Sequence, residues 1–279
     1  MENIGIDRVF PEIERLLFTD IETVTQYESL EELKKNNEAL YDCFQYKVNN
    51  WIRREYKEMT QDEYYKQMGA LYAEYGKIVC ISVGRVKNGE LSVFSFNDED
   101  EKNLLKKFCE IFKPDMGKLD KIGRDNWYEK RMVWSKHTKR EHPQILSHYY
   151  LTGHNIISFD IPYISKRCIF NGLMPPPIIP KGHLNRWEKQ CIDTRDIINN
   201  GAGMANPSLE AFAVNMGIDN PKDGDVSGRK LGDYYYKRMD ASKNMTRQQI
   251  NEVIKNYCEK DIYALYNITN YSNNLELSW

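Results

Sequence analysis

Residues 18–23 read FTDIET and end an apolar run that begins at Leu16, a composition that predicts a β-strand. Successive side chains of a strand point to opposite faces, so Asp20 and Glu22 lie on the same face. Two neighbouring carboxylates are suited to binding a cation. The pattern alone is weak, because Asp-x-Glu occurs by chance in a chain this acidic and more often marks a solvated strand end.

A second polar stretch, GHNIISFDIPY at residues 153–163, places Asp160 just before a helix start marked by Pro162. An aspartate at that position is suited to cap the helix, and proline is accepted in the first helical turn. Capping does not account for Asn155, because small and polar residues at a strand end contribute little to a core. A structural and a functional role for this stretch therefore both stay open. We expect His154 to be structural rather than catalytic.

The last helix places a carboxylate on its apolar side. It begins at the capping box Thr246-x-x-Gln249, and Asp261 falls on its apolar stripe, one turn after Tyr257. A carboxylate that faces a core is costly unless it is paired or coordinates a metal. A lysine or arginine partner across the interface is the structural alternative. The stripe consists of Ile250, Val253, Ile254, Tyr257, Asp261, Ile262 and Leu265.

The remaining pattern predicts an α/β chain. Capping boxes at Ser29 and Thr60 are each followed by apolar residues at helical spacing, and two apolar runs flank the turn dipeptide Asn88-Gly89. The elements expected are a helical insertion over 27–75, a β-hairpin over 77–96, helices over 98–112 and 160–170, and a helix from Ser208.

Residues 117–142 differ from the rest in carrying eight lysines and arginines against four acids, interleaved with Trp127, Tyr128 and Trp134. Cations bind backbone phosphates and aromatic rings stack on bases, so this basic aromatic insertion is a candidate track for a nucleic-acid strand. The alternative is a solvated basic loop whose tryptophans pack on the core.

The composition is that of a folded protein with no overall attraction to polyanions. The 279 residues are 41% hydrophobic, and 39 lysines and arginines stand against 41 acids, for a net charge of −2. Any site for nucleic acid must therefore be local. The start of the chain lacks the features of a signal peptide, and no apolar run approaches ~20 residues, so we expect a cytoplasmic protein without membrane contact. Six cysteines without a C-x-x-C pair argue against a disulfide framework and a zinc ribbon.

Taken in order, the stretches FTDIET, NIISFD and YCEKD resemble the three exonuclease motifs of the DEDD superfamily, and Tyr257, four residues before Asp261, resembles its tyrosine branch, DEDDy. The likeness is greatest to the proofreading domains of family B DNA polymerases and to stand-alone exonucleases related to them. It implies a single ribonuclease-H-like domain over residues 1–279, with a mixed five-stranded sheet flanked by helices and three antiparallel strands first. The helical insertion at about 27–75 and the basic aromatic insertion at about 117–142 depart from the family.

The same resemblance implies a metal-dependent 3′–5′ exonuclease that removes nucleotides from the 3′ end of single-stranded DNA. Its cofactors would be two divalent cations, Mg²⁺ or Mn²⁺, which agree with ligands that are all carboxylates. Asp20 would bridge both cations, Glu22 and Asp261 would complete one site, and Asp160 would hold the other. Tyr257 would orient the attacking water, because a tyrosine with an ordinary pKa of about 10 is a poor base at neutral pH. Catalysis is thus assigned to these five residues and metal binding to the four acids.

Substrate contacts are expected from the resemblance and from the basic aromatic insertion. Asn155 would touch the terminal nucleotide. The complete set expected at the substrate is Thr23, Asn155, Phe159, Trp127, Lys130, Arg131 and Trp134. Two other functions stay open: an exoribonuclease of the same superfamily, distinguished by contacts to the 2′-hydroxyl, and a nucleic-acid-binding module without turnover. The sequence does not indicate an oligomeric state.

Overall fold

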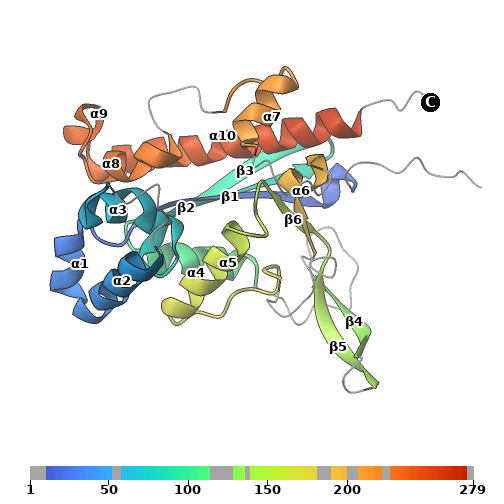
Figure 1. Cartoon of the computed structure of the whole chain (residues 1–279). Coiled ribbons are helices and arrows are strands. Elements are labelled where there is room, and N and C mark those ends of the chain that lie inside the picture. The colour runs from blue at the N-terminus through green and yellow to red at the C-terminus, as the bar shows by residue number, and fades with distance from the viewer. Residues whose placement is uncertain are drawn as a thin grey trace, which may run out of the picture.

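The fold is built on a five-stranded mixed sheet (Figure 1). The computed structural model describes residues 11–51, 58–113, 128–135, 139–180, 190–199, 207–221 and 227–274. β1 (Leu16–Thr25) pairs antiparallel with β2 (Gly76–Lys87), and β2 with β3 (Glu90–Asn97). On its other side β1 pairs in parallel with β6 (Tyr150–Gly153), and β6 with β7 (Cys191–Asp193). The order β3-β2-β1-β6-β7, with the three antiparallel strands first, confirms the predicted sheet.

The turn between β2 and β3 has the geometry that its sequence predicts. Asn88 and Gly89 have φ angles of 54° and 80°, the positive values that a tight type I′ hairpin turn requires. The ladder closes directly beside them, with Lys87 opposite Glu90. The predicted hairpin is therefore confirmed.

β1 is buried on both faces, which explains why it begins as an unbroken apolar run. Leu17 packs in a core with helices α4 (Glu101–Ile111) and α5 (Asp160–Phe170). Phe18 packs in a second core under α10 (Arg247–Asn273). Figure 1 shows α10 along one face of the sheet and α4 and α5 on the other. The sheet thus presents alternate residues of β1 to α10.

α10 approaches the sheet closely at a glycine. A Cβ atom at Gly84 of β2 would lie 2.5 Å from Cγ2 of Ile262 on α10, so a larger residue would push the helix away. The helix begins at the predicted capping box of Thr246 and Gln249, whose two reciprocal hydrogen bonds are both present. The capping box therefore determines where α10 starts, and the glycine at position 84 determines how closely the helix approaches the sheet.

The helical insertion has a core of its own. Between β1 and β2 lie α1 (Leu30–Asn36), α2 (Glu38–Trp51), α3 (Gln61–Met68) and the 3-10 helix η3 (Gly69–Leu71). Ser29 caps α1 and Thr60 forms the predicted capping box of α3. Phe44 packs edge-to-face against Tyr65 and Tyr75 at 5.2 and 5.0 Å between ring centroids. The predicted helices of this insertion are present, except that the first is divided at Asn37 into α1 and α2.

The second insertion contains a separate two-stranded sheet that the sequence did not predict. β4 (Tyr128–Ser135) pairs antiparallel with β5 (Arg140–Ser147), and Figure 1 shows this hairpin projecting from the body. Lys130, Arg131 and Trp134 lie on β4. Residues 117–127 and 136–138 of the predicted insertion, Trp127 included, lie outside the described residues.

Shorter helices complete the chain. α7 begins after Ser208, whose side chain accepts a hydrogen bond from the N–H of Ala211, as the predicted helix start requires. No helix in the described part of the chain is long and apolar enough to cross a membrane. The remaining helices are η1 (Ile13–Arg15), α6 (Thr194–Ile198), α7 (Leu209–Asn215), η5 (Gly228–Lys230), α8 (Leu231–Tyr235) and α9 (Asp240–Lys243).

Candidate active site

β1 places Asp20 and Glu22 on the face that α10 covers. In the ladder Asp20 lies opposite Ser82 and Glu22 opposite Cys80, but Thr23 lies opposite Ile78, so Val79 forms a β-bulge. Carboxylate oxygens of Asp20 and Glu22 lie within 4.8 Å of each other and of the sulfur of Cys258. The two acids of FTDIET therefore share one face, as their spacing predicts.

α10 contributes Tyr257, Cys258 and Asp261, all buried. The thiol of Cys258 donates to Oδ2 of Asp20 at 3.4 Å. Burial, first, and then the charges of Asp261, Glu22 and Asp160 raise the pKa of Asp20 well above its usual range. The charge of Asp261 on α10 thus contributes to the raised pKa of Asp20 on β1.

Asp160 completes the acidic group from the start of α5. Its Oδ1 accepts a hydrogen bond from the N–H of Ile21, 3.2 Å away on β1, and the residue is only 4% exposed. The N-cap of α5 is Phe159, and Asp160 is the first helical residue, so the capping role considered for Asp160 is wrong. Burial, with further contributions from Asp193 and Asp261, raises the pKa of Asp160 to about 7.

α5 is held by a buried ion pair. Arg167 binds Glu101 of α4 through two of its nitrogens and donates to the carbonyl of Ala73 at 2.9 Å. A paired arginine with both charges buried fixes the position of a helix strongly, since neither partner can be withdrawn without leaving a buried charge. The start of α5, and with it Asp160, is positioned by this contact.

Asp193 shapes the loop that contains Asn155. Its carboxylate accepts from the N–H of Asn155 at 2.9 Å and from the N–H of Ile157 at 3.2 Å. Asn155 has a φ of 63°, a left-handed conformation that asparagine tolerates. Its Oδ1 is buried and has no hydrogen-bond partner among the described residues, so this oxygen is an unsatisfied acceptor.

The sequence alone assigns no role to Asp193, whose function in shaping this loop is visible only in the fold. Both ring nitrogens of the neighbouring His154 have partners, the Thr194 hydroxyl at 3.2 Å and the Pro207 carbonyl at 2.8 Å. These contacts agree with the structural role expected for His154.

Tyr257 stands beside the carboxylates. Its hydroxyl accepts a hydrogen bond from the N–H of Gly228 at 3.1 Å. Burial and then the charges of Glu22, Asp261 and Asp20 raise the pKa of Tyr257, so it stays protonated at neutral pH. A protonated hydroxyl that accepts one hydrogen bond still has its own proton to donate.

The other residues expected at the substrate are less directly placed. Thr23 donates to the carbonyl of Ala70 at 3.0 Å, so its hydroxyl is engaged with the helical insertion. Phe159 packs against Tyr163 at 5.3 Å between ring centroids, beside the helix start that carries Asp160. The substrate roles of the residues in the second insertion stay predictions, because only the backbone of Lys130, Arg131 and Trp134 is described.

Sequence reasoning missed Cys258 as a neighbour of the acids and placed it only among the reduced cysteines. The available signal was its position three residues before Asp261, the spacing that puts two helical side chains on one side.

The donor set fits divalent cations of the Mg²⁺ or Mn²⁺ type. Burial, and then the charges of neighbouring carboxylates, raise the pKa values of Asp20 and Asp160, and a cation is what allows such groups to ionise together. Hard oxygen ligands are those that Mg²⁺ and Mn²⁺ prefer. Among the described residues, however, the group whose ligand atoms all lie within 4.8 Å of one another includes the thiol of Cys258 together with Asp20 and Glu22, which a set of carboxylates alone does not predict.

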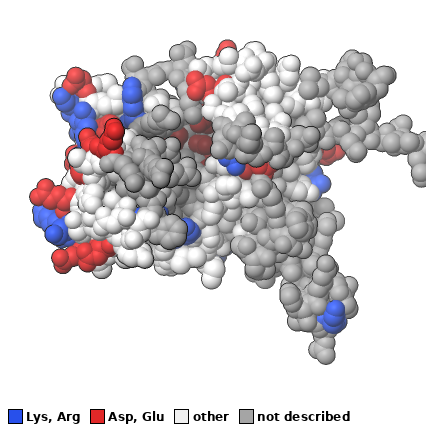
Figure 2. Space-filling model, viewed as in Figure 1, with Lys and Arg blue, Asp and Glu red and all other residues white. Residues whose placement is uncertain are grey.

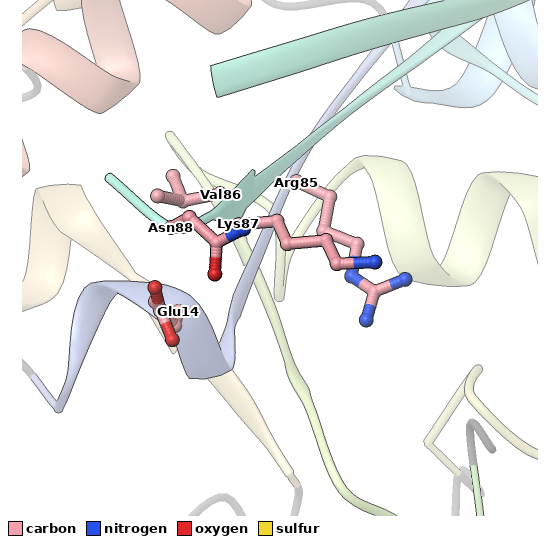
Figure 3. A pocket seen from close by; sticks show the side chains of 5 residues that line it. All are labelled: Glu14, Arg85, Val86, Lys87 and Asn88. Atoms are coloured by element: carbon pink, nitrogen blue, oxygen red, sulfur yellow. The ribbon is translucent and has the colours of Figure 1, made fainter. Parts of the chain in front are cut away.

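A pocket elsewhere contains none of these acids. It is lined by Glu14, Arg85, Val86, Lys87 and Asn88, near the β2–β3 turn (Figure 3). Glu14 lies across the pocket from Arg85 and Lys87 (Figure 3). The Arg85 guanidinium donates a hydrogen bond to the Tyr149 hydroxyl at 2.6 Å. Figure 2 shows basic and acidic side chains mixed over the region of α1, α8 and α9, in keeping with the near-zero net charge.

The fold and the acidic group define an RNase H-like α/β domain with a candidate metal site. A family model described as RNase H superfamily matches residues 69–273, most of the chain, and the chain belongs to this superfamily. No curated protein matches the chain. The matched span contains Asp160, Tyr257 and Asp261, and it begins after β1. Membership supports nuclease-type activity, since proteins of this superfamily generally hydrolyse phosphodiester bonds in nucleic acids, typically with divalent metals.

Proposed function

We propose that this protein is a metal-dependent 3′–5′ exonuclease that removes nucleotides from the 3′ end of single-stranded DNA. The observation that carries the proposal is the convergence of Asp20, Glu22, Asp160 and Asp261 from three separate elements onto one place, where burial and the charges of neighbouring acids raise the pKa values of Asp20 and Asp160. Structural acids are rarely gathered in this way, because their mutual repulsion costs stability. The superfamily and the resemblance to the DEDD motifs supply the class of reaction.

In this proposal the four carboxylates hold two divalent cations. The bound cations would activate the attacking water and stabilise the charge that develops on the phosphodiester. Asp20 is central, since Asp261, Glu22 and Asp160 all act on its pKa. Asp160, held by the N–H of Ile21, is a ligand whose orientation the main chain fixes.

Tyr257 positions the water in this mechanism and does not deprotonate it. Its raised pKa keeps the phenol protonated, and its contact with the N–H of Gly228 fixes the direction of the hydroxyl. Asn155 would bind the terminal nucleotide with its buried side-chain oxygen, which has no partner among the residues that the structure describes. In this proposal Tyr257 positions the attacking water and Asn155 positions the terminal nucleotide.

The proposal is tested with a single-stranded oligonucleotide labelled at its 5′ end, as DNA and as RNA, incubated with Mn²⁺, with Mg²⁺ and with chelator. We expect a ladder of progressively shortened DNA that chelator abolishes, and no cutting of a circular single strand. Asp20→Asn should remove the ladder, while Glu90→Gln, an exposed acid on β3, should not.

The other outcomes separate the alternatives. Shortening of RNA but not of DNA would identify an exoribonuclease. Binding of either strand without any metal-dependent shortening would identify a nucleic-acid-binding module without turnover. A cut circle would contradict the requirement for a 3′ end.

A further inference from the structure

Two cations share the ring of one buried tyrosine near the carboxylates. The Lys77 ammonium lies 4.9 Å and the Arg247 guanidinium 4.2 Å from the centroid of Tyr235, the last residue of α8. Tyr235 is 5% exposed, and both cations are partly exposed. The ring therefore fixes the two charges in place and leaves their outer sides accessible.

These cations lie on the same face of the sheet as the acids. Lys77 is opposite Val24, which is two residues after Glu22 on β1. Val24, Tyr235 and Tyr257 pack in one buried cluster. The bulge at Val79 is what turns Lys77 toward α10, because without the extra residue the alternation of β2 would direct it to the opposite face.

Neither Lys77 nor Arg247 forms an ion pair within the described ranges, and Arg247 donates only to the carbonyl of Tyr235, at 2.8 Å. Arg247 is also the first residue of α10, whose first turn contains no acid. A cation is unfavourable at the positive end of a helix dipole. The neighbouring Arg238 differs, because it is paired with Asp233 and serves the structure.

We propose, on the basis of the exonuclease function proposed above, that Lys77 and Arg247 bind the phosphate backbone of the strand whose 3′ end lies at the carboxylates. Arg247 and Tyr257 are ten residues apart on one helix, which separates them by about 15 Å along its axis. At about 3.4 Å per nucleotide of a stacked strand, this distance corresponds to about four nucleotides. Only strands longer than about four nucleotides therefore reach Lys77 and Arg247, which bind them by charge.

The test measures binding of a fluorescent 12-nucleotide single strand by anisotropy at several salt concentrations, with chelator present to prevent hydrolysis. The variant is Lys77→Gln with Arg247→Gln. Its matched control is Lys102→Gln with Lys106→Gln, which removes two exposed charges from α4 on the other face of the sheet. A charge-conserving variant, Lys77→Arg with Arg247→Lys, separates loss of charge from altered packing on Tyr235.

We expect weaker binding in the glutamine variant and a shallower slope of log affinity against log salt, by about 0.7 for each phosphate that the variant no longer neutralises. The α4 control and the charge-conserving variant should keep the wild-type slope, and binding of a two-nucleotide strand should be unchanged. If the glutamine variant does not fold, Lys77→Gln alone should still reduce the slope. An unchanged slope in a folded variant would overturn this inference and leave the exonuclease proposal intact. A wild type that binds no strand would contradict the exonuclease proposal itself.

Discussion

Replacement of Asp160 by asparagine should stabilise the metal-free protein at alkaline pH. Asparagine has nearly the same shape and still accepts the hydrogen bond from the N–H of Ile21, but it does not ionise. The wild-type carboxyl has a pKa of about 7 in the folded protein, against 3.8 for the unperturbed group. Between these values the folded chain holds a proton that the unfolded chain releases, so stability falls as pH rises.

The size of the effect follows from the same two pKa values. A shift of about 3 units corresponds to about 4 kcal/mol, the stability lost once pH has risen through the folded pKa. At pH 5 only about 2 kcal/mol of this loss has occurred. Since a domain is typically stable by only about 5–15 kcal/mol, the gain from Asp160→Asn at pH 8 is easily measured.

The assay is urea unfolding with chelator at pH 5 and pH 8, for the wild type, Asp160→Asn and the exposed control Glu90→Gln. The gain of Asp160→Asn over the wild type should be about twice as large at pH 8 as at pH 5, and the control should show no gain. Adding Mn²⁺ should shrink the difference, because only the wild type keeps the complete ligand set. If Asp160→Asn were no more stable than the wild type at pH 8, the reasoning that folding raises the pKa of this carboxyl would be refuted.

Three further predictions concern the proposed activity. Millimolar Mn²⁺ or Mg²⁺ should raise the melting temperature of the wild type, and Asp20→Asn should lose most of this rise; an unchanged wild-type curve would contradict a metal site. Tyr257→Phe should slow hydrolysis by about 10- to 100-fold while the affinity for DNA stays the same, whereas a parallel loss of binding would assign Tyr257 to packing. A fourfold alanine variant of the second insertion should bind long single strands more weakly and with a shallower salt dependence, yet cleave very short substrates normally; equal binding at every salt concentration would make the segment structural. Its substitutions are at Lys130, Arg131, Lys139 and Arg140.

The parts of the fold that the sequence predicted are those with local causes. The turn at Asn88-Gly89 and the capping box at Thr246 each depend on residues within a few positions of one another, and both occur as expected. The shared face of Asp20 and Glu22 follows from strand geometry alone. Asp261 stands out because a charge interrupts an apolar stripe, which is also a local pattern.

The parts that were missed depend on contacts between distant segments. The hydrogen bonds of Asp193 to the loop of Asn155 join two strand ends about forty residues apart in sequence. The contact of Cys258 with Asp20 spans most of the chain. The sequence did not predict β4 and β5, because their many charged residues interrupt the alternation of apolar and polar residues by which a hairpin is usually recognised. The bulge at Val79 has no turn residue to mark it.

The length of α10 affects how much free energy the proposed reaction would need for aligning the residues that bind the strand with those that cleave it. Arg247, Tyr257 and Asp261 belong to one uninterrupted helix of 27 residues, so the spacing between the charge that would hold the strand and the groups that would cleave it is set before any substrate arrives. Binding then need not spend free energy on ordering a loop or closing a lid to bring these parts into register. The entropy of that arrangement is lost once, when the chain folds, and not at each removed nucleotide.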